Sequence, residues 1–83
     1  MKGKDAFVPQ EPEEMEYHEY LDYWVCKCRN FEKLEGFMAC DRYGNFRSPF
    51  GAAYCRCQRC GSVIHVDTKT IIGINPNPDR RDF

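Results

Sequence analysis

The sequence has no long apolar segment, and this absence excludes a membrane-spanning helix, which needs about 20 consecutive apolar residues. The longest uninterrupted apolar runs contain four residues, as at Tyr23–Cys26. The N-terminus leads into acidic residues and not into an apolar stretch, so no secretory signal is predicted, although a mature secreted chain could have lost one. We therefore expect no membrane association.

The sequence also lacks the common catalytic motifs. It contains no Gly-x-Ser-x-Gly motif, phosphate-binding loop or other glycine-rich phosphate cradle. The zinc-deaminase signature requires a glutamate two residues after the His or Cys that precedes its Cys-x-x-Cys pair. In this chain Arg42 follows Cys40 at that distance, and Cys28 follows Cys26. We therefore expect a protein that is not an enzyme.

A formal net charge of −1 conceals two regions of opposite charge. Residues 1–22 contain two lysines and seven acidic residues, whereas residues 23–83 contain ten basic and six acidic residues. We interpret residues 1–14, which Pro9 and Pro12 interrupt, as a flexible acidic arm. A charge asymmetry of this kind concerns partners and association, and it does not determine the fold.

The chain is too short to form a large hydrophobic core. A chain of 83 residues forms one domain at most, and domains of this size commonly need disulfides or a metal to become stable. Six cysteines are available for this purpose, namely Cys26, Cys28, Cys40, Cys55, Cys57 and Cys60. The central question is whether these cysteines bind a metal or one another.

The hydrophobic pattern predicts a small, mostly β (α+β) domain over residues 15–75, followed by a flexible C-terminal tail over residues 76–83. Apolar residues between positions 17 and 25 follow helical spacing, so we expect a short N-terminal helix over residues 13–20. The β-prone end of that stretch predicts a strand over residues 22–26. Further strands are expected over residues 37–40, 46–50, 62–67 and 70–74.

The cysteines form two clusters with the spacing of metal ligands. The first cluster is Cys26-Lys27-Cys28, and the second contains Cys57-Gln58-Arg59-Cys60-Gly61. Two residues between cysteines let a tight turn direct both sulfurs at one point, and a following glycine permits the positive φ that turns the backbone back. Small secreted disulfide frameworks usually spread their cysteines more evenly, so this spacing favours a metal site.

The second cluster resembles the knuckles of zinc ribbons, and the resemblance covers about residues 22–75. It implies a zinc-ribbon-like antiparallel sheet and one Zn²⁺ ion held by four thiolates. The first cluster departs from the family pattern, because one residue separates its cysteines and Asn30 is the nearest residue able to replace the usual glycine. The ligands that we predict are Cys26, Cys28, Cys57 and Cys60, with Cys55 as the first substitute and Cys40 as the second.

Other uses of the cysteines stay open. The six cysteines could pair as disulfides in a secreted module. Four cysteines could bind iron as well as zinc, and a reactive pair could exchange thiols with disulfides.

Four basic residues flank the predicted ligands, namely Lys27, Arg29, Arg56 and Arg59. They could simply offset the negative charge of a tetrathiolate site. They could instead contact phosphates or an acidic protein groove, with nearby aromatic residues stacking on bases.

The zinc-ribbon resemblance implies a non-enzymatic adaptor or regulator of the transcription or nucleic-acid machinery, such as the accessory or inhibitor proteins that bacteriophages make to modify host enzymes. The expected partner is a larger protein of that machinery or nucleic acid itself, and the expected location is intracellular, cytoplasmic or nuclear. The alternatives are a protein–protein interaction module that docks through its acidic arm and aromatic residues, and a thiol redox or disulfide-stapled protein.

Overall fold

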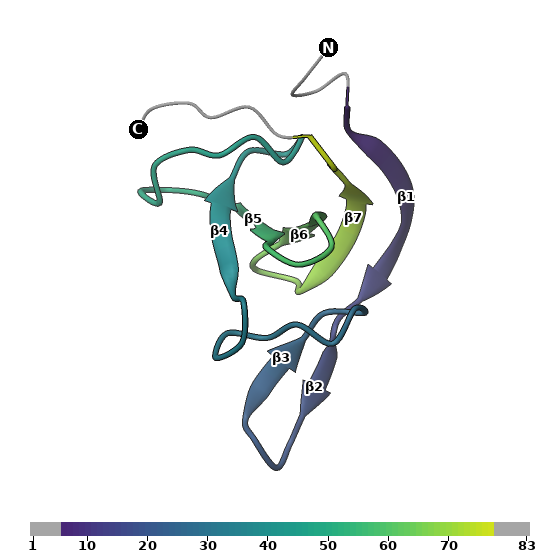
Figure 1. Ribbon diagram of the computed structural model, residues 1–83, viewed down its shortest axis with the longest axis vertical. Helices are drawn as coiled ribbons and strands as arrows, with labels where there is room; N and C mark the ends of the chain where they lie inside the picture. The colour runs from purple at the N-terminus through teal and green to yellow at the C-terminus, as the bar shows by residue number, and fades with distance from the viewer. Residues whose placement is uncertain (1–5, 78–83) are drawn as a thin grey trace.

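The structure, a computed structural model, describes residues 6–77 and contains seven β-strands and no helix in that range (Figure 1). Residues 1–5 and 78–83, which include the ends of the predicted arm and tail, lie outside the described residues. The strands are β1 (Val8–Glu14), β2 (Glu16–His18), β3 (Tyr23–Val25), β4 (Phe37–Cys40), β5 (Tyr54–Cys57), β6 (Ser62–His65) and β7 (Thr70–Ile74).

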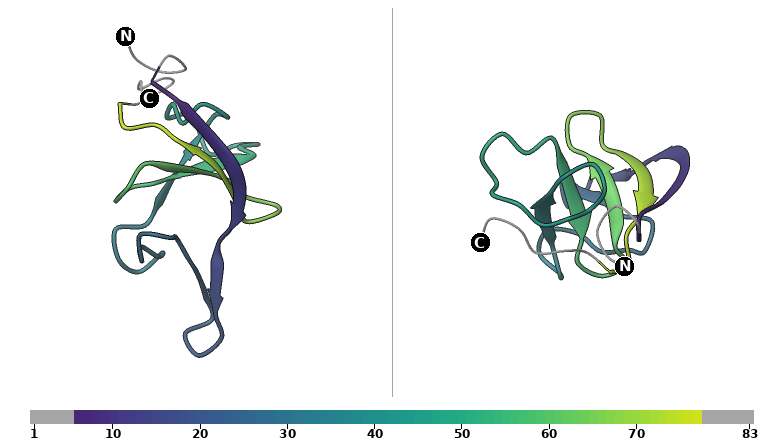
Figure 2. Two further views of the ribbon diagram at one scale, coloured as in Figure 1. Left: turned by 90° about the vertical axis from the view of Figure 1, so that its right-hand side faces the viewer. Right: turned by 90° about the horizontal axis from the view of Figure 1, so that it is seen from above.

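The strands form two antiparallel sheets. The larger sheet has five strands in the order β1-β7-β6-β5-β4, and β2 and β3 form a separate hairpin. The hairpin extends from one end of the larger sheet, and the molecule measures 40 × 26 × 20 Å (Figures 1 and 2). A small β-domain of this kind is consistent with a zinc-ribbon-like domain.

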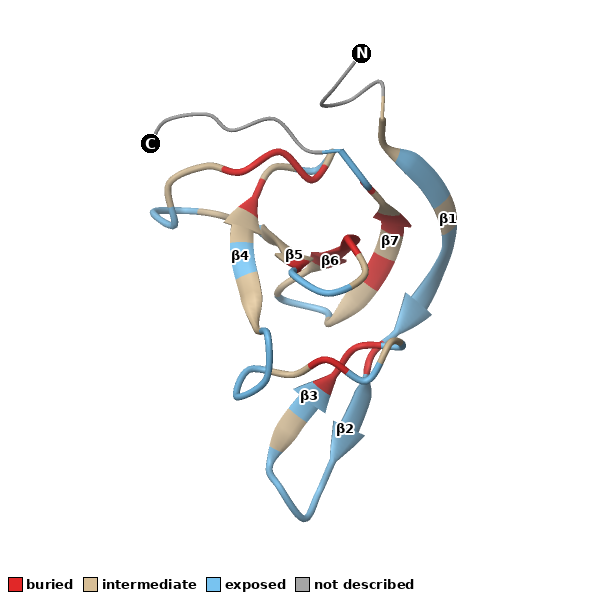
Figure 3. Cartoon of the chain, viewed as in Figure 1, coloured by how far each residue is buried: buried red, intermediate tan, exposed pale blue. Residues whose placement is uncertain are grey.

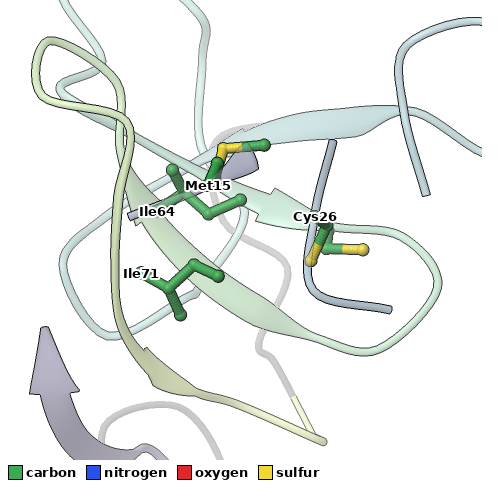
Figure 4. Packing of buried hydrophobic residues seen from close by; sticks show 5 residues of the cluster. Met15, Cys26, Ile64 and Ile71 are labelled. Carbon is green, nitrogen blue, oxygen red and sulfur yellow. The ribbon is translucent and has the colours of Figure 1, made fainter. Parts of the chain in front are cut away.

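The hairpin β6–β7 forms the centre of the hydrophobic core. Ile64 on β6 pairs with Ile71 on β7, and both side chains are fully buried. Met15 packs on them, and Cys26 and Cys57 complete the cluster (Figure 4). Burial is concentrated in β6, β7, the segments that carry these cysteines and the loop after β4, whereas the hairpin β2–β3 is mostly exposed (Figure 3). The core is therefore small, and cysteines form a large part of it.

Successive side chains of the strands point to opposite faces of the sheet. Cys55, Cys57 and Ile64 lie on the face that meets Met15, which we call the cysteine face. Arg56 points to the opposite face, where its guanidinium lies 5.7 Å from the centroid of the Phe46 ring. The predicted metal ligands of the second cluster therefore belong to one side of the sheet.

The predicted helix over residues 13–20 is wrong. The helical spacing of Tyr17 and Trp24 instead corresponds to a cross-strand pair of the hairpin β2–β3, with ring centroids 5.1 Å apart. The connecting turn is closed by Asp22, which has φ of 60°, donates its N–H to the carbonyl of His18 and accepts the Tyr17 hydroxyl. A helix would gain little here, because the apolar residues at the tip of the hairpin face solvent and have no apolar surface to cover.

The prediction of a flexible arm over residues 1–14 is corrected for residues 8–14. These residues form β1, which pairs with β7 along one edge of the sheet. Pro9 and Pro12 lie in this edge strand, where a missing backbone N–H is tolerated. The acidic side chains are exposed, so the high charge of the segment does not conflict with strand pairing.

The other predicted strands agree with the structure except in one place. Strands β4 and β7 match the expected segments, and β6 ends at His65 because residues 66–69 form a turn. The predicted strand over residues 46–50 is wrong, since only an isolated bridge between Cys40 and Phe46 forms there. Strand β5 was not predicted, because its alternating cysteine and arginine residues indicate a ligand loop as readily as a strand.

Candidate metal centre

The two cysteine clusters meet at one point in the structure. The Sγ atoms of Cys26, Cys28, Cys57 and Cys60 all lie within 4.8 Å of one another. The Sγ atoms of Cys26 and Cys60 lie 3.6 Å apart, and those of Cys28 and Cys57 lie 3.5 Å apart. Four thiolates at about 2.3 Å from a tetrahedral zinc ion would lie about 3.8 Å apart. The four predicted cysteines therefore fit one metal ion, and a sulfur separation of this size is far beyond that of a disulfide.

The cluster connects the two sheets. Cys26 directly follows β3 of the hairpin, and Cys57 is the last residue of β5 in the larger sheet. Both are buried, whereas Cys28 and Cys60 are only half-buried. A metal bound here would therefore fasten the hairpin to the sheet.

The first knuckle, residues 26–30, is closed by two backbone hydrogen bonds. The N–H of Arg29 donates to the carbonyl of Cys26, and the N–H of Cys26 donates to the carbonyl of Asn30, both at 2.8 Å. Arg29 has φ of 79° and so takes the conformation that the usual glycine would provide. The expectation that Asn30 replaces this glycine is therefore corrected.

The second knuckle, residues 57–61, has the geometry that the sequence predicts. Gly61 has φ of 85°, and its N–H donates to the carbonyl of Cys57 at 2.9 Å. The N–H groups of Arg59 and Cys60 point to the Cys57 sulfur at 3.4 and 3.5 Å. A β-carbon on Gly61 would lie 2.9 Å from both the Asn75 carbonyl oxygen and the Arg56 guanidinium, so the glycine is needed here for space as well as conformation.

Asn30 connects the metal centre to the following loop, and sequence reasoning missed this role. Its side chain is fully buried, and its Oδ1 accepts the N–H groups of Glu35 and Gly36 at 2.9 and 3.2 Å. Its Nδ2 donates to the Gly36 carbonyl at 2.7 Å and to the Cys57 sulfur at 3.2 Å. The sequence indicates this role only by placing an amide side chain two residues after the first cysteine cluster.

Hydrogen bonding distributes negative charge unevenly among Cys26, Cys28 and Cys57. A hydrogen bond from Cys26 lowers the pKa of Cys57 to about 4, and the surrounding N–H groups act in the same direction. The same contact, together with burial, raises the pKa of Cys26, and burial raises the pKa of Cys28. Without a metal, the cluster thus holds a thiolate at Cys57 beside protonated thiols at Cys26 and Cys28. A bound cation would replace those protons.

The remaining two cysteines, which sequence analysis ranked as substitute ligands, lie outside the cluster. Cys55 packs beside it on the cysteine face, and Cys40 is fully buried. Burial raises the pKa of Cys40 to about 12 and that of Cys55 to about 11, so both stay protonated at neutral pH. All six cysteines are free thiols, and the structure therefore does not support the disulfide-stapled alternative.

The structure separates the four basic residues that sequence analysis grouped together. Lys27, Arg29 and Arg59 are exposed on the two knuckles, and we call them the knuckle cations. Arg56 is half-buried and donates through Nε and Nη2 to the Asn75 carbonyl at 3.0 and 2.8 Å. Arg56 therefore fastens the sheet to the segment after β7, and its guanidinium is not part of the exposed basic group.

Comparisons with family models, curated proteins and solved structures found no match to this chain. No helix within residues 6–77 is long and apolar enough to cross a membrane.

Proposed function

We propose that the four clustered cysteines bind one zinc ion and that the protein is a non-enzymatic binding module. The proposal depends on a single observation, the convergence of four sulfurs from two separate segments within 4.8 Å. Four thiolates complete a tetrahedral zinc site and leave no position for a catalytic water. The metal is therefore structural, which agrees with a protein that has no catalytic motif.

The energetic role of the ion follows from the small core. Structural zinc sites in small peptides contribute about 10–16 kcal/mol at neutral pH, which equals or exceeds the net stability of a typical domain. The apolar cluster of this protein contains few aliphatic side chains and is continuous with the cysteines. Zinc would therefore determine whether the hairpin and the sheet assemble, in a compartment where thiols stay reduced.

The binding role rests on the knuckle cations. Because the two knuckles converge on one site, Lys27, Arg29 and Arg59 surround the same metal centre, and all three are exposed. Three exposed positive charges on one side of the molecule can contact the phosphates of a nucleic acid or an acidic surface of a larger protein. We therefore propose that the protein is an intracellular adaptor or regulator that contacts the nucleic-acid machinery with this side.

Native mass spectrometry before and after a strong chelator tests the metal site. We expect one zinc ion per chain, loss of the folded charge-state distribution when the ion is removed, and six free thiols after denaturation. A colourless protein supports zinc, whereas visible absorption would indicate iron. Three disulfides and no metal would overturn the proposal.

A salt titration of nucleic-acid binding tests the partner. The double variant Arg29→Ala/Arg59→Ala should lose most of its affinity for a mixed-sequence oligonucleotide and should show a shallower dependence on salt. Arg42→Ala/Arg47→Ala is the matched control, because it removes the same charge from residues that follow the opposite end of β4 from the knuckles. Equal losses in both variants, or binding that does not depend on salt, would contradict a specific phosphate contact and would leave an acidic protein as the partner to test.

A further inference from the structure

A groove lies between the hairpin β2–β3 and the cysteine face of the larger sheet. It encloses about 470 Å³, which is within the range of sites that bind small molecules or single anchoring side chains. Its lining residues come from the hairpin, the loop before β4, and strands β4, β5 and β6. The proposed zinc site does not occupy this space, because none of its four ligands lines the groove.

The floor and walls of the groove are apolar and adaptable. Ile64, Phe37 and Met15 line it on the side of the cysteine face, and Trp24 lines it on the side of the hairpin. Trp24 is 39% exposed, which is high for a large apolar side chain. Met15 can adjust its shape to an incoming side chain, because methionine side chains are flexible.

The rim of the groove is acidic. Asp22, Glu32 and Glu35 line it and are exposed, and within residues 6–77 the carboxylates of Glu32 and Glu35 have no ion-pair or hydrogen-bond partner. The cation on the rim, Lys69, already donates to the Val66 carbonyl at 2.7 Å, and its ammonium lies 5.8 Å from the centroid of the Trp24 ring. The rim therefore offers uncompensated negative charge next to an apolar floor.

We propose that this groove binds a partner protein segment in which an apolar side chain stands beside lysine or arginine. The apolar side chain enters between Trp24 and Phe37, and the basic residue reaches Glu32 or Glu35. Charge complementarity selects this class of segment, since an acidic or purely aliphatic segment would leave the two carboxylates without partners. The cation over Trp24 shows that this wall already accommodates a positive charge.

This inference goes beyond the proposed function, because the groove and the knuckle cations have opposite charge and contact opposite kinds of surface. A protein with both could bridge an anionic partner and a basic one. Zinc stoichiometry and the salt titration above do not involve groove residues, so failure of either proposal can be recognised separately.

Trp24 is the only tryptophan of the chain, and its fluorescence therefore reports on the groove directly. We would titrate the zinc-loaded protein with three synthetic peptides: Arg-Phe-Arg-Leu-Arg, Arg-Gly-Arg-Gly-Arg and Glu-Phe-Glu-Leu-Glu. Only the first should change Trp24 fluorescence and shift the backbone amide resonances of Met38 and Glu35. Equal binding of the third peptide would show a contact without charge selection and would overturn the proposal.

Variants of the rim and wall complete the test. Glu32→Gln/Glu35→Gln should weaken binding of the first peptide about tenfold, whereas the control Glu11→Gln/Glu13→Gln on β1 removes the same charge and should leave it unchanged. Trp24→Ala should weaken binding of the first peptide at least tenfold, followed at the backbone amide of Glu35, because it removes the apolar contact on the hairpin side. Unchanged affinity in both groove variants, or a dimer in sedimentation that Trp24→Ala dissociates, would assign the groove to another contact and refute the proposal.

Discussion

The larger sheet and the hairpin β2–β3 keep their positions by different forces. Each strand of the larger sheet pairs along its length with a neighbour, and Ile64 and Ile71 fill the centre. The hairpin pairs only with itself and reaches the rest of the molecule through Met15, the cysteine cluster and the contact of Lys69 with Trp24. Strand pairing therefore holds the sheet together, whereas the position of the hairpin depends mainly on sulfur chemistry.

The largest expected effect is the loss of a ligand that joins these two regions. Cys57→Ser should abolish stoichiometric zinc binding and, since such sites contribute about 10–16 kcal/mol, should also abolish cooperative folding. Circular dichroism and metal analysis measure both effects. Cys40→Ala, on the face opposite the cluster, should retain zinc and lose only about 1–2 kcal/mol of stability. A Cys57→Ser protein that keeps one zinc ion and native amide dispersion would show that the sheet and hairpin associate without a fourth thiolate.

The next largest expected loss of stability concerns the hydrogen bonds of Asn30, which connect the cysteine cluster to the following loop. Asn30→Ala removes the acceptor of the Glu35 N–H and the buried donor to the Cys57 sulfur, so we expect a loss of about 2–4 kcal/mol in denaturant unfolding. Gln58→Ala removes an exposed amide nearby and should cost less than about 0.5 kcal/mol. Equal stability of the two variants would contradict a structural role for Asn30.

A smaller effect tests the second knuckle within the sheet. Gly61→Ala combines a positive φ with contacts at 2.9 Å, and we expect a loss of about 3 kcal/mol. Gly51 also has a positive φ, of 68°, but a β-carbon there would meet no atom within 4 Å. Gly51→Ala should therefore cost about 1 kcal/mol, and the difference between the two variants measures the crowding against Arg56 and Asn75. Equal losses would show that crowding at Gly61 has no energetic consequence.

The smallest effect is a dependence on alkaline pH that arises in the sheet. The folded-state pKa values of Cys40 and Cys55, about 12 and 11, lie above the ordinary thiol value of 9.0. The two protonated thiols contribute fully to the stability of the folded state below pH 9. This contribution is lost as the pH rises through 11 and 12, because the unfolded chain releases these protons first. Denaturant unfolding at pH 8 and 9.5 should show a loss of about 1–2 kcal/mol, and the variant Cys40→Ala/Cys55→Ala should show a weaker dependence. The same slope in both proteins would assign the effect to other groups.

The parts of the fold that follow short-range rules could be predicted from the sequence. The spacing within Cys57-x-x-Cys60-Gly61 requires a tight turn, and this turn is present. The strands β4, β6 and β7 follow from β-branched and apolar runs, and the choice of four cysteines among six followed from their clustering.

The remaining parts depend on contacts between distant residues. Strand β1 is acidic and contains two prolines, and only its pairing with β7 makes it a strand. Tyr17 and Trp24 match a helix as well as a hairpin, because a separation of seven residues is compatible with both. The inward orientation of Arg56 depends on the Asn75 carbonyl, 19 residues away, which no local pattern indicates.

Strand β1 also has a consequence for the behaviour of the protein at high concentration. The outer edge of a sheet can recruit strands from other molecules, and long flat edges promote aggregation. Here that edge carries two residues without an amide hydrogen and a row of exposed glutamates, so an incoming strand would meet missing donors and electrostatic repulsion. The acidic segment thus protects the β1 edge of the sheet from self-association, whatever partners the protein binds elsewhere.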